Sequence, residues 1–330
     1  MTGHVMVFAP EPQLTVTVER RGDGDEIHLH PGGQGVWQAR MISSLGCPVV
    51  LCASMGGEVG RVIEPLIAAE GIAVRAISAG SRNGAYVHDR RSGNRVDVAE
   101  VPGDPLSRHE LDELYGLTLA EGLVAEVCVL SGAADSAVAP PDVYRRLSAD
   151  LTRNGRRVVA DLSGDHLGAV LAGKPDVVKV SHEDLGIKDD MESLTHAVCS
   201  LREAGANTVV VTRANRPAVA LLEETIYEVV TPPLEPADPR GAGDSLTAGL
   251  AATLAAGGAI EEAVQAGAAA GALNVTRHGL GTGEAGAVDR LRERVRLTPV
   301  GRRVPQGEEH SDAPDIRATP SELAHRVDVP

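Results

Sequence analysis

The stretch Asp238-Pro-Arg-Gly-Ala-Gly-Asp244 combines residue types that could carry out a chemical step. Two glycines flank an alanine, one aspartate follows, and leucines then recur at helical spacing at positions 246, 250 and 254. We therefore expect a helix to begin near Asp244, where its free N–H groups and positive dipole end form an anion site. Because a carboxylate would repel a resting anion, we infer that Asp244 accepts a proton from a hydroxyl that attacks a phosphoryl group held by those N–H groups.

A structural interpretation of the same aspartate stays open at this stage. Aspartate is one of the residues that most often cap the N-terminus of a helix, and a glycine turn before a helix is common. The spacing of Asp244 fits both roles.

Two other patterns point to chemistry more weakly. The run Gly33-Gln-Gly-Val-Trp-Gln38 matches only half of the GxGxxG motif of dinucleotide-binding proteins, and no acidic ribose partner is evident. His28 and His30 could form a pair of metal ligands on one strand face, but a polar strand face is the simpler explanation because no third ligand is in view. The sequence therefore disfavours a dehydrogenase and a histidine metal centre.

Composition limits the partners and the compartment. The 330 residues carry a net charge of −15, which argues against nucleic acid as a partner because binding phosphate backbones requires clustered Lys and Arg. The four cysteines show no metal-ligand spacing, so a reduced, cytoplasmic protein is expected. No basic segment precedes a long apolar run, and no apolar run could cross a bilayer, so we expect neither secretion nor membrane insertion.

The elements that must position Asp244 follow from hydrophobic patterning. Valine-rich runs that read as buried strands alternate with amphipathic helical stretches, which predicts an α/β fold with a central, mostly parallel sheet flanked by helices. The predicted strands are 5–10, 48–54, 126–132, 157–163, 176–181 and 208–213. The predicted helices include 58–70, 107–121, 141–153 and 191–204.

Two stretches break this rhythm with a strict polar–apolar alternation. They lie at about 15–30 and 84–100, and each contains a turn signal typical of a hairpin. We interpret them as a small antiparallel sheet that forms a lid beside the main domain. Because such a sheet exposes one face and unpaired edges, we expect it to mediate a homodimer, with Val87, Val96 and Val98 as candidates for its apolar face.

The C-terminal part of the chain loses all periodicity. After about residue 298 the sequence is polar and contains prolines. We therefore predict one domain over residues 1–297 and a disordered tail over 298–330.

The stretch DPRGAGDSLTAG resembles the C-terminal signature of the PfkB/ribokinase family of carbohydrate kinases. Four further segments resemble motifs of this family, in an order that matches its 1-phosphofructokinase and tagatose-6-phosphate kinase branch over residues 5–297. They are GGQGVWQA (32–39), GGEVG (56–60), LSGAADSAVAPP (130–141) and ADLSG (160–164). The resemblance implies a Rossmann-like α/β domain with a β-sheet lid, ATP and Mg²⁺ as cofactors, and phosphoryl transfer to a hydroxyl of a sugar or sugar phosphate.

The resemblance assigns the catalytic roles within this signature. Asp244 would be the base that deprotonates the sugar hydroxyl. Gly241, Ala242 and Gly243 would supply the anion hole for the transferred phosphoryl group. Arg240 stands at a variable family position, where it could contact phosphate or lie solvated at the surface.

The resemblance also indicates where the cofactors would bind. Lys179-Val-Ser-His-Glu-Asp-Leu185 takes the place of the family's KPNxxEL motif, whose Asn and Glu organise metal and phosphates. Here Ser181 and Asp184 hold those places, with Glu183 adjacent, so an acid could bind Mg²⁺ through water. Ser181 as a helix cap with acids in the first turn is the structural alternative. Lys179 could face phosphates or be solvated.

Three further positions correspond to family residues near the nucleotide. Thr212 and Arg213 lie at a strand end that replaces the family's glycine-containing loop, and Arg213 could clamp phosphates or narrow the site. Asn274 falls near the family's nucleoside contact, although a satisfied surface asparagine is an equally good interpretation.

The acceptor side departs most from the family pattern. The family's glycine is present as Gly33. In contrast, Gln34 stands in place of a lysine, Trp37 in place of an asparagine and Thr15 in place of an aspartate. Trp37 could stack on a sugar or pack within a helix, and Arg82 is a candidate cation for a substrate phosphate. We therefore expect a kinase with an altered acceptor pocket; a non-catalytic nucleotide- or sugar-binding regulator that retains the fold is the alternative.

Overall fold

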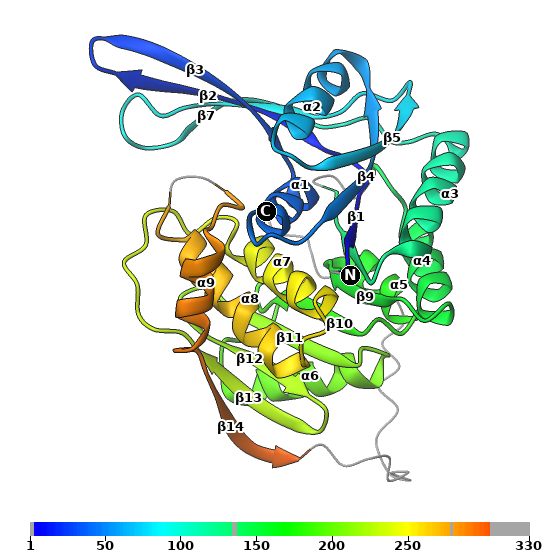
Figure 1. Cartoon of the computed structure of the whole chain (residues 1–330), viewed down its shortest axis with the longest axis vertical. Coiled ribbons are helices and arrows are strands. Elements are labelled where there is room, and N and C mark those ends of the chain that lie inside the picture. The colour runs from blue at the N-terminus through cyan, green and yellow to red at the C-terminus, as the bar shows by residue number, and fades with distance from the viewer. Residues whose placement is uncertain (1–2, 134–136, 278–279, 304–330) are drawn as a thin grey trace, which may run out of the picture.

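The chain folds into a large sheet covered by helices on both faces, with a smaller sheet beside it (Figure 1). The structure is a computed structural model that describes residues 3–133, 137–277 and 280–303. Within these residues the main sheet has ten strands. In spatial order they are β14 (Arg296–Arg303), β13 (Thr225–Val230), β12 (Arg216–Leu222), β11 (Thr208–Arg213), β10 (Val177–Ser181), β9 (Arg157–Asp161), β8 (Val127–Ser131), β1 (Val5–Ala9), β4 (Val49–Gly56) and β5 (Ala73–Ala79).

The predicted parallel sheet is confirmed from β11 across to β5, where every neighbouring pair is parallel. All six predicted strands are present within three residues of their expected bounds. The remaining strands β12, β13 and β14 extend the sheet in an antiparallel manner. Because the carboxyl ends of parallel strands meet at one edge of a sheet, Ser131, Asp161 and Ser181 come to the same edge, where ligands bind in open α/β folds.

Two groups of helices bury the two faces of this sheet, and the four predicted helices are confirmed among them. One face carries α1 (Gln34–Ser44), α2 (Gly57–Ala69), α7 (Ala242–Ala255), α8 (Ile260–Asn274) and α9 (Ala285–Arg292). The other face carries α3 (Arg108–Val124), α4 (Pro141–Arg153), α5 (Gly164–Leu171) and α6 (Met191–Glu203).

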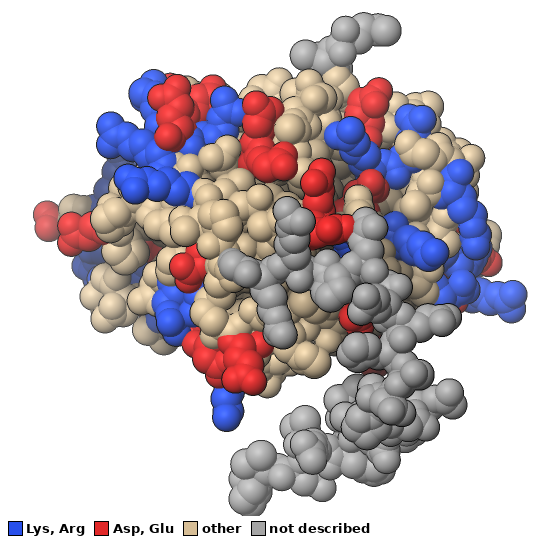
Figure 2. All heavy atoms as spheres, turned by 90° about the horizontal axis from the view of Figure 1, so that it is seen from below, with Lys and Arg blue, Asp and Glu red and all other residues tan. Residues whose placement is uncertain are grey.

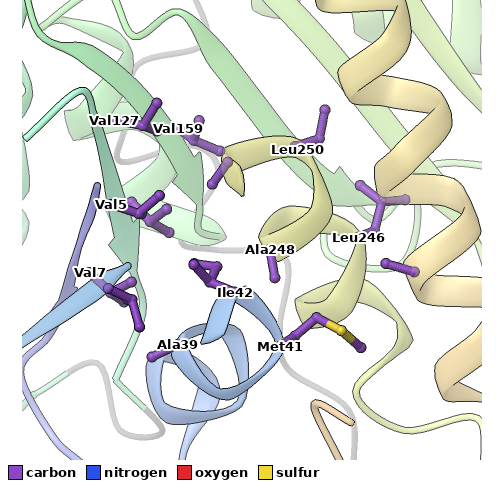
Figure 3. Close-up of a cluster of buried hydrophobic side chains, with 14 of the residues drawn as sticks. Val5, Val7, Ala39, Met41, Ile42, Val127, Val159, Leu246, Ala248 and Leu250 are labelled. Carbon is purple, nitrogen blue, oxygen red and sulfur yellow. The ribbon is translucent and has the colours of Figure 1, made fainter. Parts of the chain in front are cut away.

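The packing of α1 and α7 against the strands brings the two motif-bearing helices together. Figure 3 shows Ala39, Met41 and Ile42 of α1 pointing toward strand valines and toward side chains of α7, among them Ala248. These side chains are almost completely buried. With few aromatics available, this core is built from Val, Leu and Ala. The contact fixes the N-terminus of α1, with Gln34, beside the N-terminus of α7, with Asp244.

The smaller sheet, which we call the lid sheet, contains the strands β3 (Gly24–Gly32), β2 (Gln13–Arg21), β6 (Ala85–Asp89) and β7 (Val96–Val101) in that order. It lies above the main sheet in Figure 1 and projects past α1. The two predicted hairpins are present, but the prediction of an antiparallel sheet is wrong for its central pair, since β2 and β6 run parallel. The reason is that β2 follows β1 and β6 follows β5, and β1 and β5 point the same way in the main sheet.

The predicted boundary between domain and tail needs a correction. Residues 298–303 belong to β14, which pairs with β13 at the edge of the main sheet. An edge strand tolerates the polar residues and the proline that removed any strand signal from the sequence. The rest of the predicted tail, 304–330, lies outside the described residues.

The surface reflects the acidic but mixed composition. On the face seen in Figure 2, small groups of Asp and Glu are interspersed with small groups of Lys and Arg. All four cysteines are free. Within the described part of the chain, no helix is both long and apolar enough to cross a membrane.

Candidate active site at the N-terminus of α7

Asp244 lies in the first turn of α7 and is 9% exposed. The N-cap of this helix is Gly241, whose φ of 71° is in the left-handed region that glycine adopts without strain. The capping interpretation of Asp244 is therefore wrong. Its carboxylate is instead buried beside the unpaired N–H groups of the first helical turn.

A cation lies directly against the loop at Gly243. A Cβ atom at this position would be 2.5 Å from Nζ of Lys179, which is closer than real Cβ contacts. The ammonium group therefore sits beneath the glycine-rich loop, and it adds a full positive charge to the partial charges of the helix N-terminus. Lys179 is thus not solvated. An anion bound at the loop would interact with both the ammonium group and the N-terminus of the helix.

Asp161, at the end of β9, holds this ammonium group in place. Its carboxylate accepts hydrogen bonds from Lys179 Nζ at 3.1 Å, Gln38 Nε2 at 3.0 Å and Thr247 Oγ1 at 2.7 Å. Gln38 Oε1 in turn accepts a hydrogen bond from Ser131 Oγ. We call the set of Asp161, Lys179, Gln38 and Thr247 the Asp161 network. Sequence reasoning quoted the segment around Asp161 as a motif but gave this aspartate no role.

The charges of the Asp161 network set the ionisation of its members. Burial alone would lower the pKa of Lys179, but the carboxylates of Asp161 and Asp244 outweigh burial and raise it above its ordinary value. Burial, followed by the charge of Asp161, raises the pKa of Asp244 to about 7, although Lys179 and hydrogen bonds from Gln34 and Gln38 act in the opposite direction. A carboxylate with a pKa near neutrality can accept a proton and release it again under ordinary conditions.

Gln34 belongs to this site rather than to an open substrate pocket. Its Oε1 accepts a hydrogen bond from Gly132 N at 2.7 Å, which ties the N-terminus of α1 to the loop after β8. The side chain of Gln34 also acts on Asp244 by lowering its pKa. A lysine here would place a second cation beside Lys179, so the glutamine leaves Lys179 as the cation that faces Asp244.

Asn274 is a satisfied asparagine, as one interpretation held, but it is not at the surface. Its side chain is completely buried. Nδ2 donates to the carbonyl of Arg240 at 2.7 Å, and Oδ1 accepts from Gly281 N at 3.0 Å. Both ends of the amide are therefore used to fix the start of the glycine-rich loop against the segment after α8.

Arg213 is likewise not available to clamp phosphates. Only 2% of this residue is exposed, and Nε donates to Asp189 Oδ1 at 2.5 Å. The predicted phosphate contact is therefore wrong for Arg213, because its guanidinium points into the protein. The neighbouring Thr212 is partly buried and pairs with Ser181 across β11 and β10, so it does lie at the site's edge of the sheet.

Ser181 and Asp184 form a reciprocal contact, but residues 182–186 are turns that follow β10 and not the helix that the capping interpretation predicted. Ser181 Oγ donates to Asp184 Oδ2 at 2.6 Å and accepts from Asp184 N at 3.0 Å. Asp184 and Glu183 nevertheless remain exposed, and the charge of Asp184 helps to raise the pKa of Lys179. An exposed carboxylate near an anion site fits Mg²⁺, which keeps most of its waters and needs few protein ligands. In residues 3–133, 137–277 and 280–303, this site included, no group of three His, Cys, Asp or Glu side chains could hold a metal ion.

Thr15 and Trp37 line a cavity of about 450 Å³ between the lid sheet and α1. Arg240 also lines it, with Nε donating to Asp238 Oδ1 at 2.9 Å, so this arginine is neither freely solvated nor bound to the anion loop itself. Gly33, with φ of 97°, forms the turn that leads from the lid sheet into α1. These acceptor-side residues therefore lie around the N-terminus of α1.

Arg82 lies apart from the cavity. Its guanidinium donates two hydrogen bonds to Asp104, at 2.8 and 3.0 Å, and its side chain is 64% exposed. It is absent from the described residues that line the cavity. The structure therefore does not bring Arg82 to the other predicted acceptor residues.

The sequence that carries this site matches a known protein family. Residues 2–285 match the family model described as pfkB family carbohydrate kinase. The chain belongs to the pfkB family. Members of this family are phosphotransferases that act on an alcohol group, and they use ATP together with Mg²⁺.

Relatives of this pfkB kinase include sugar-phosphate kinases. The chain is 29% identical over 262 residues to ATP-dependent 6-phosphofructokinase isozyme 2 of Escherichia coli, an alignment that covers 76% of this chain and 83% of the relative. The tetrameric inhibited form of phosphofructokinase-2 from the same organism has the same fold (TM-score 0.75, 24% identity, 88% and 98% of the two chains). So does a protein described as a possible 1-phosphofructokinase from Thermotoga maritima (TM-score 0.77, 18% identity, 90% and 99%).

Proposed function

We propose that this pfkB-family enzyme phosphorylates a hydroxyl of a sugar or sugar phosphate with ATP, and that Asp244 is its general base. The observation that carries the proposal is the placement of Asp244, buried in the first turn of α7 with a pKa of about 7. A base with a pKa near the working pH transfers protons most efficiently. Non-catalytic sugar or nucleotide binding would not require a carboxylate at this place.

The roles of the surrounding residues follow from their positions. Asp244 accepts the proton of the attacking hydroxyl. The N–H groups of residues 241–243 and the ammonium of Lys179 stabilise the negative charge that the phosphoryl oxygens carry during transfer. Asp161 keeps Lys179 beneath the loop, so the positive charge is already in place before the reaction begins.

Mg²⁺ fits the exposed carboxylate of Asp184, with Glu183 beside it. The ion would neutralise phosphate charge when bound, as it does in other phosphoryl-transfer enzymes. Asp184 would hold it through water, since the carboxylate already accepts a hydrogen bond from Ser181. Ser181 then orients the carboxylate.

The acceptor is expected to differ from those of the 1-phosphofructokinase and tagatose-6-phosphate kinase branch. Thr15 offers fewer and weaker acceptor sites to sugar hydroxyls than an aspartate, Gln34 carries no charge, and the ring of Trp37 fills space that an asparagine leaves open. Each lost charge-assisted bond would lower affinity by roughly 1.5–3 kcal/mol. Fructose 1-phosphate and tagatose 6-phosphate should therefore be poor substrates.

An ADP-release assay with ATP and Mg²⁺ tests this function over a panel of sugars, sugar phosphates and nucleosides. We expect at least one acceptor to support turnover and Asp244→Asn to reduce it by roughly 10²–10⁴-fold, with nucleotide binding retained. Asp165→Asn is the matched control, because Asp165 is an exposed aspartate in the first turn of α5. Near wild-type turnover by Asp244→Asn would rule out the assignment of the base.

The lid sheet should also form a homodimer interface. Its pairing register places Val16, Leu29 and Val87 in one row and Val18 and Ile27 in the next, all on the same face. Ile27 is 66% exposed and Leu29 is 48% exposed, as are the predicted Val96 and Val98 at 54% and 62%. A second copy of the same sheet could cover this apolar face, and a relative, phosphofructokinase-2 of Escherichia coli, has a tetrameric form.

Leu29→Glu tests the dimer. A charge in the middle of the exposed row should convert the dimer to a monomer without unfolding the chain, because the side chain makes no core contact in one protomer. Light scattering at micromolar concentration measures the mass, and Val124→Glu, on a valine of α3 that is 65% exposed, is the control. A monomeric wild-type protein would contradict the proposal.

A further inference from the structure

A second cavity opens at the edge of the main sheet that lies opposite Asp244. It has a volume of about 800 Å³, and the first residues of β9, β10, β11 and β13 line it. We call it the basal cavity. β9 begins in its wall at Arg157 and ends at Asp161, and α7 begins near Asp244 and reaches the cavity with Leu254 in its last turn. At about 3.3 Å per residue, β9 separates the basal cavity from the candidate active site by about 13 Å.

The lining of the basal cavity is polar and carries charges of both signs. One asparagine and two threonines add neutral hydrogen-bonding groups. Among the described residues that line the cavity, none is aromatic, so it offers no ring on which a nucleobase could stack. The ionisable side chains of the lining are Arg157, Asp176, Arg202, Glu223 and Glu224.

Main-chain carbonyls, rather than carboxylates, hold the two arginines of the basal cavity. Arg157 Nη1 donates to the carbonyl of Leu254 at 3.4 Å, and Arg202 Nη1 donates to the carbonyl of Asn207. In the part of the chain that the structure describes, neither guanidinium forms an ion pair with a carboxylate. Because a guanidinium has five N–H donors, each arginine keeps donors for an anionic group.

Asp176 lies between the two arginines in the order of the strands, but its carboxylate is already used. Oδ2 accepts a hydrogen bond from Val158 N on β9 at 2.8 Å. Burial raises the pKa of Asp176, against smaller opposing effects of that hydrogen bond and of the charge of Arg157. An anion that approaches the arginines therefore meets two guanidiniums and one half-buried carboxylate that belongs to the framework of the sheet.

The opposite end of the basal cavity is acidic. A two-residue turn, Glu223-Glu224, joins β12 to β13, and both residues line the cavity. Glu223 has a φ of 51°, in the left-handed region that hairpin turns of this length usually assign to glycine or asparagine. A side chain larger than glycine costs roughly 1–2 kcal/mol there. A carboxylate is thus present at a position where the backbone alone favours glycine, which is typical of functional sites.

The cationic and acidic ends of the basal cavity lie on different strands. Arg157 starts β9, three strands away from β12 in the sheet. Arg202 is bonded to the residue before β11, one strand away from β12. At about 4.8 Å per strand, the two arginines are about 14 Å and about 5 Å from the glutamate turn. A ligand that contacts both ends must therefore be elongated and carry opposite charges at its two ends.

We propose that the basal cavity binds an elongated zwitterion of the class of the free basic amino acids. Its carboxylate would lie between Arg157 and Arg202, and its guanidinium or ammonium group would lie at Glu223 and Glu224, so that both ends form charge-assisted hydrogen bonds. A ligand with negative charges alone fits less well, because three lining carboxylates outnumber two guanidiniums. The proposal concerns a site apart from Asp244 and does not depend on the proposed kinase function.

Isothermal titration calorimetry of the full chain with three matched probes tests the ligand class. The probes are L-arginine, agmatine and L-citrulline. Agmatine lacks the carboxylate of arginine, and citrulline carries a neutral urea group in place of the guanidinium, so each removes one charge. We expect arginine to bind with saturation at one site per chain. Agmatine and citrulline should each bind about 10- to 100-fold more weakly, because each loses a charge-assisted contact.

Variants of the lining assign each end of the ligand to its partner. Arg202→Gln and Glu223→Gln should each weaken arginine binding by about 10- to 100-fold. Arg202→Gln should not weaken agmatine binding further, and Glu223→Gln should not weaken citrulline binding further, because the charge that each variant would meet is already absent. Arg153→Gln and Glu203→Gln are the controls, on exposed residues of α4 and α6 outside the cavity lining.

Glu223→Gly separates ligand binding from the fold of the turn. Glycine adopts the left-handed conformation without strain, so this variant should keep or raise the melting temperature. Its affinity for arginine should nevertheless fall as that of Glu223→Gln does. A loss of binding in a protein that is no less stable is a result that a merely structural role of Glu223 would not produce.

Three results would overturn the proposal. An absence of saturable arginine binding at millimolar concentration would show that the cavity takes no such ligand. Equal affinities for arginine, agmatine and citrulline, or wild-type affinity in both Arg202→Gln and Glu223→Gln, would show that the zwitterion binds elsewhere. Binding of glucose 6-phosphate that Arg202→Gln weakens and that arginine cannot displace would identify a site for anions instead of zwitterions.

Discussion

The Asp161 network and the cavity of about 450 Å³ between the lid sheet and α1, here called the lid cavity, are both rich in charge. They differ in how fully their polar groups are satisfied. Asp161 accepts hydrogen bonds from Lys179, Gln38 and Thr247 within the protein. In the lid cavity, His88 and Arg90 each leave a buried atom without a partner. A catalytic centre gains from groups that are fixed before substrate arrives, whereas a binding cavity can leave donors for the ligand to satisfy. The first region is therefore preformed, whereas the second keeps buried polar atoms without a partner.

Asp161→Asn tests whether the preformed network sets the reactivity of Asp244. The negative charge of Asp161 raises the pKa of Asp244 and also draws Lys179 toward itself. Without that charge, Lys179 would interact with Asp244 alone, and the pKa of Asp244 should fall. We expect a turnover number reduced by about tenfold or more and a pH profile whose acid limb moves to lower pH.

The measurement for Asp161→Asn is kcat/KM as a function of pH, beside Asp142→Asn as a control on an exposed aspartate of α4. A reduced rate with an unchanged acid limb would mean that Asp161 supports the fold of the site without influencing Asp244. The claim that the preformed Asp161 network sets the pKa of Asp244 would then be wrong.

Gly243→Ala sharpens the comparison by disturbing the ammonium without removing a charge. The added methyl group would lie 2.5 Å from Lys179 Nζ, so the lysine must move. We expect turnover to fall by about tenfold because the positive charge no longer sits beneath the loop. Gly116→Ala in α3 is the control, since a Cβ there meets no atom within 4 Å. Wild-type turnover by Gly243→Ala would show that the position of Lys179 is not critical.

The sequence predicted the framework of the site better than its interior. Valine runs and helical spacing located the strands and helices around Asp244, because those signals are local. The bonds of Asp161 join positions far apart in the chain, and Gln38 lies 123 residues from it, so no spacing rule could reveal them. The phosphate contact of Arg213 and the surface position of Asn274 were wrong because these residue types suggest exposure, whereas packing buries them. The residues left open in the lid cavity were also invisible, since an unused donor is defined by its surroundings.

The smallest expected effect concerns stability rather than rate. The raised pKa means that folded Asp244 still holds its proton at pH values where the unfolded chain has lost it, so its contribution to stability is full below its ordinary pKa of 3.8 and is lost as the pH rises through about 7. Asparagine does not ionise, so the Asp244→Asn variant does not lose stability as the pH rises. The variant should be more stable than the wild-type protein above pH 7, by about 1 kcal/mol or more, and should show no such gain at pH 4.

Chemical denaturation of both proteins at the two pH values measures this difference. Equal stabilities above pH 7 would show that the buried carboxylate is fully compensated by Lys179. The pKa of Asp244 would then not be raised in the folded protein, which would contradict the electrostatic argument.

The most direct test of the central claim is the rate of phosphoryl transfer in a single turnover, measured with an accepted substrate on both sides of pH 7. If Asp244 is the general base, the wild-type rate rises with pH until about 7 and then levels off, in line with the pKa of this carboxyl. Asp244→Asn should be slower by roughly 10²–10⁴-fold and should lack this limb. A variant that keeps the wild-type rate, or that shows the same rise with pH, would contradict the account.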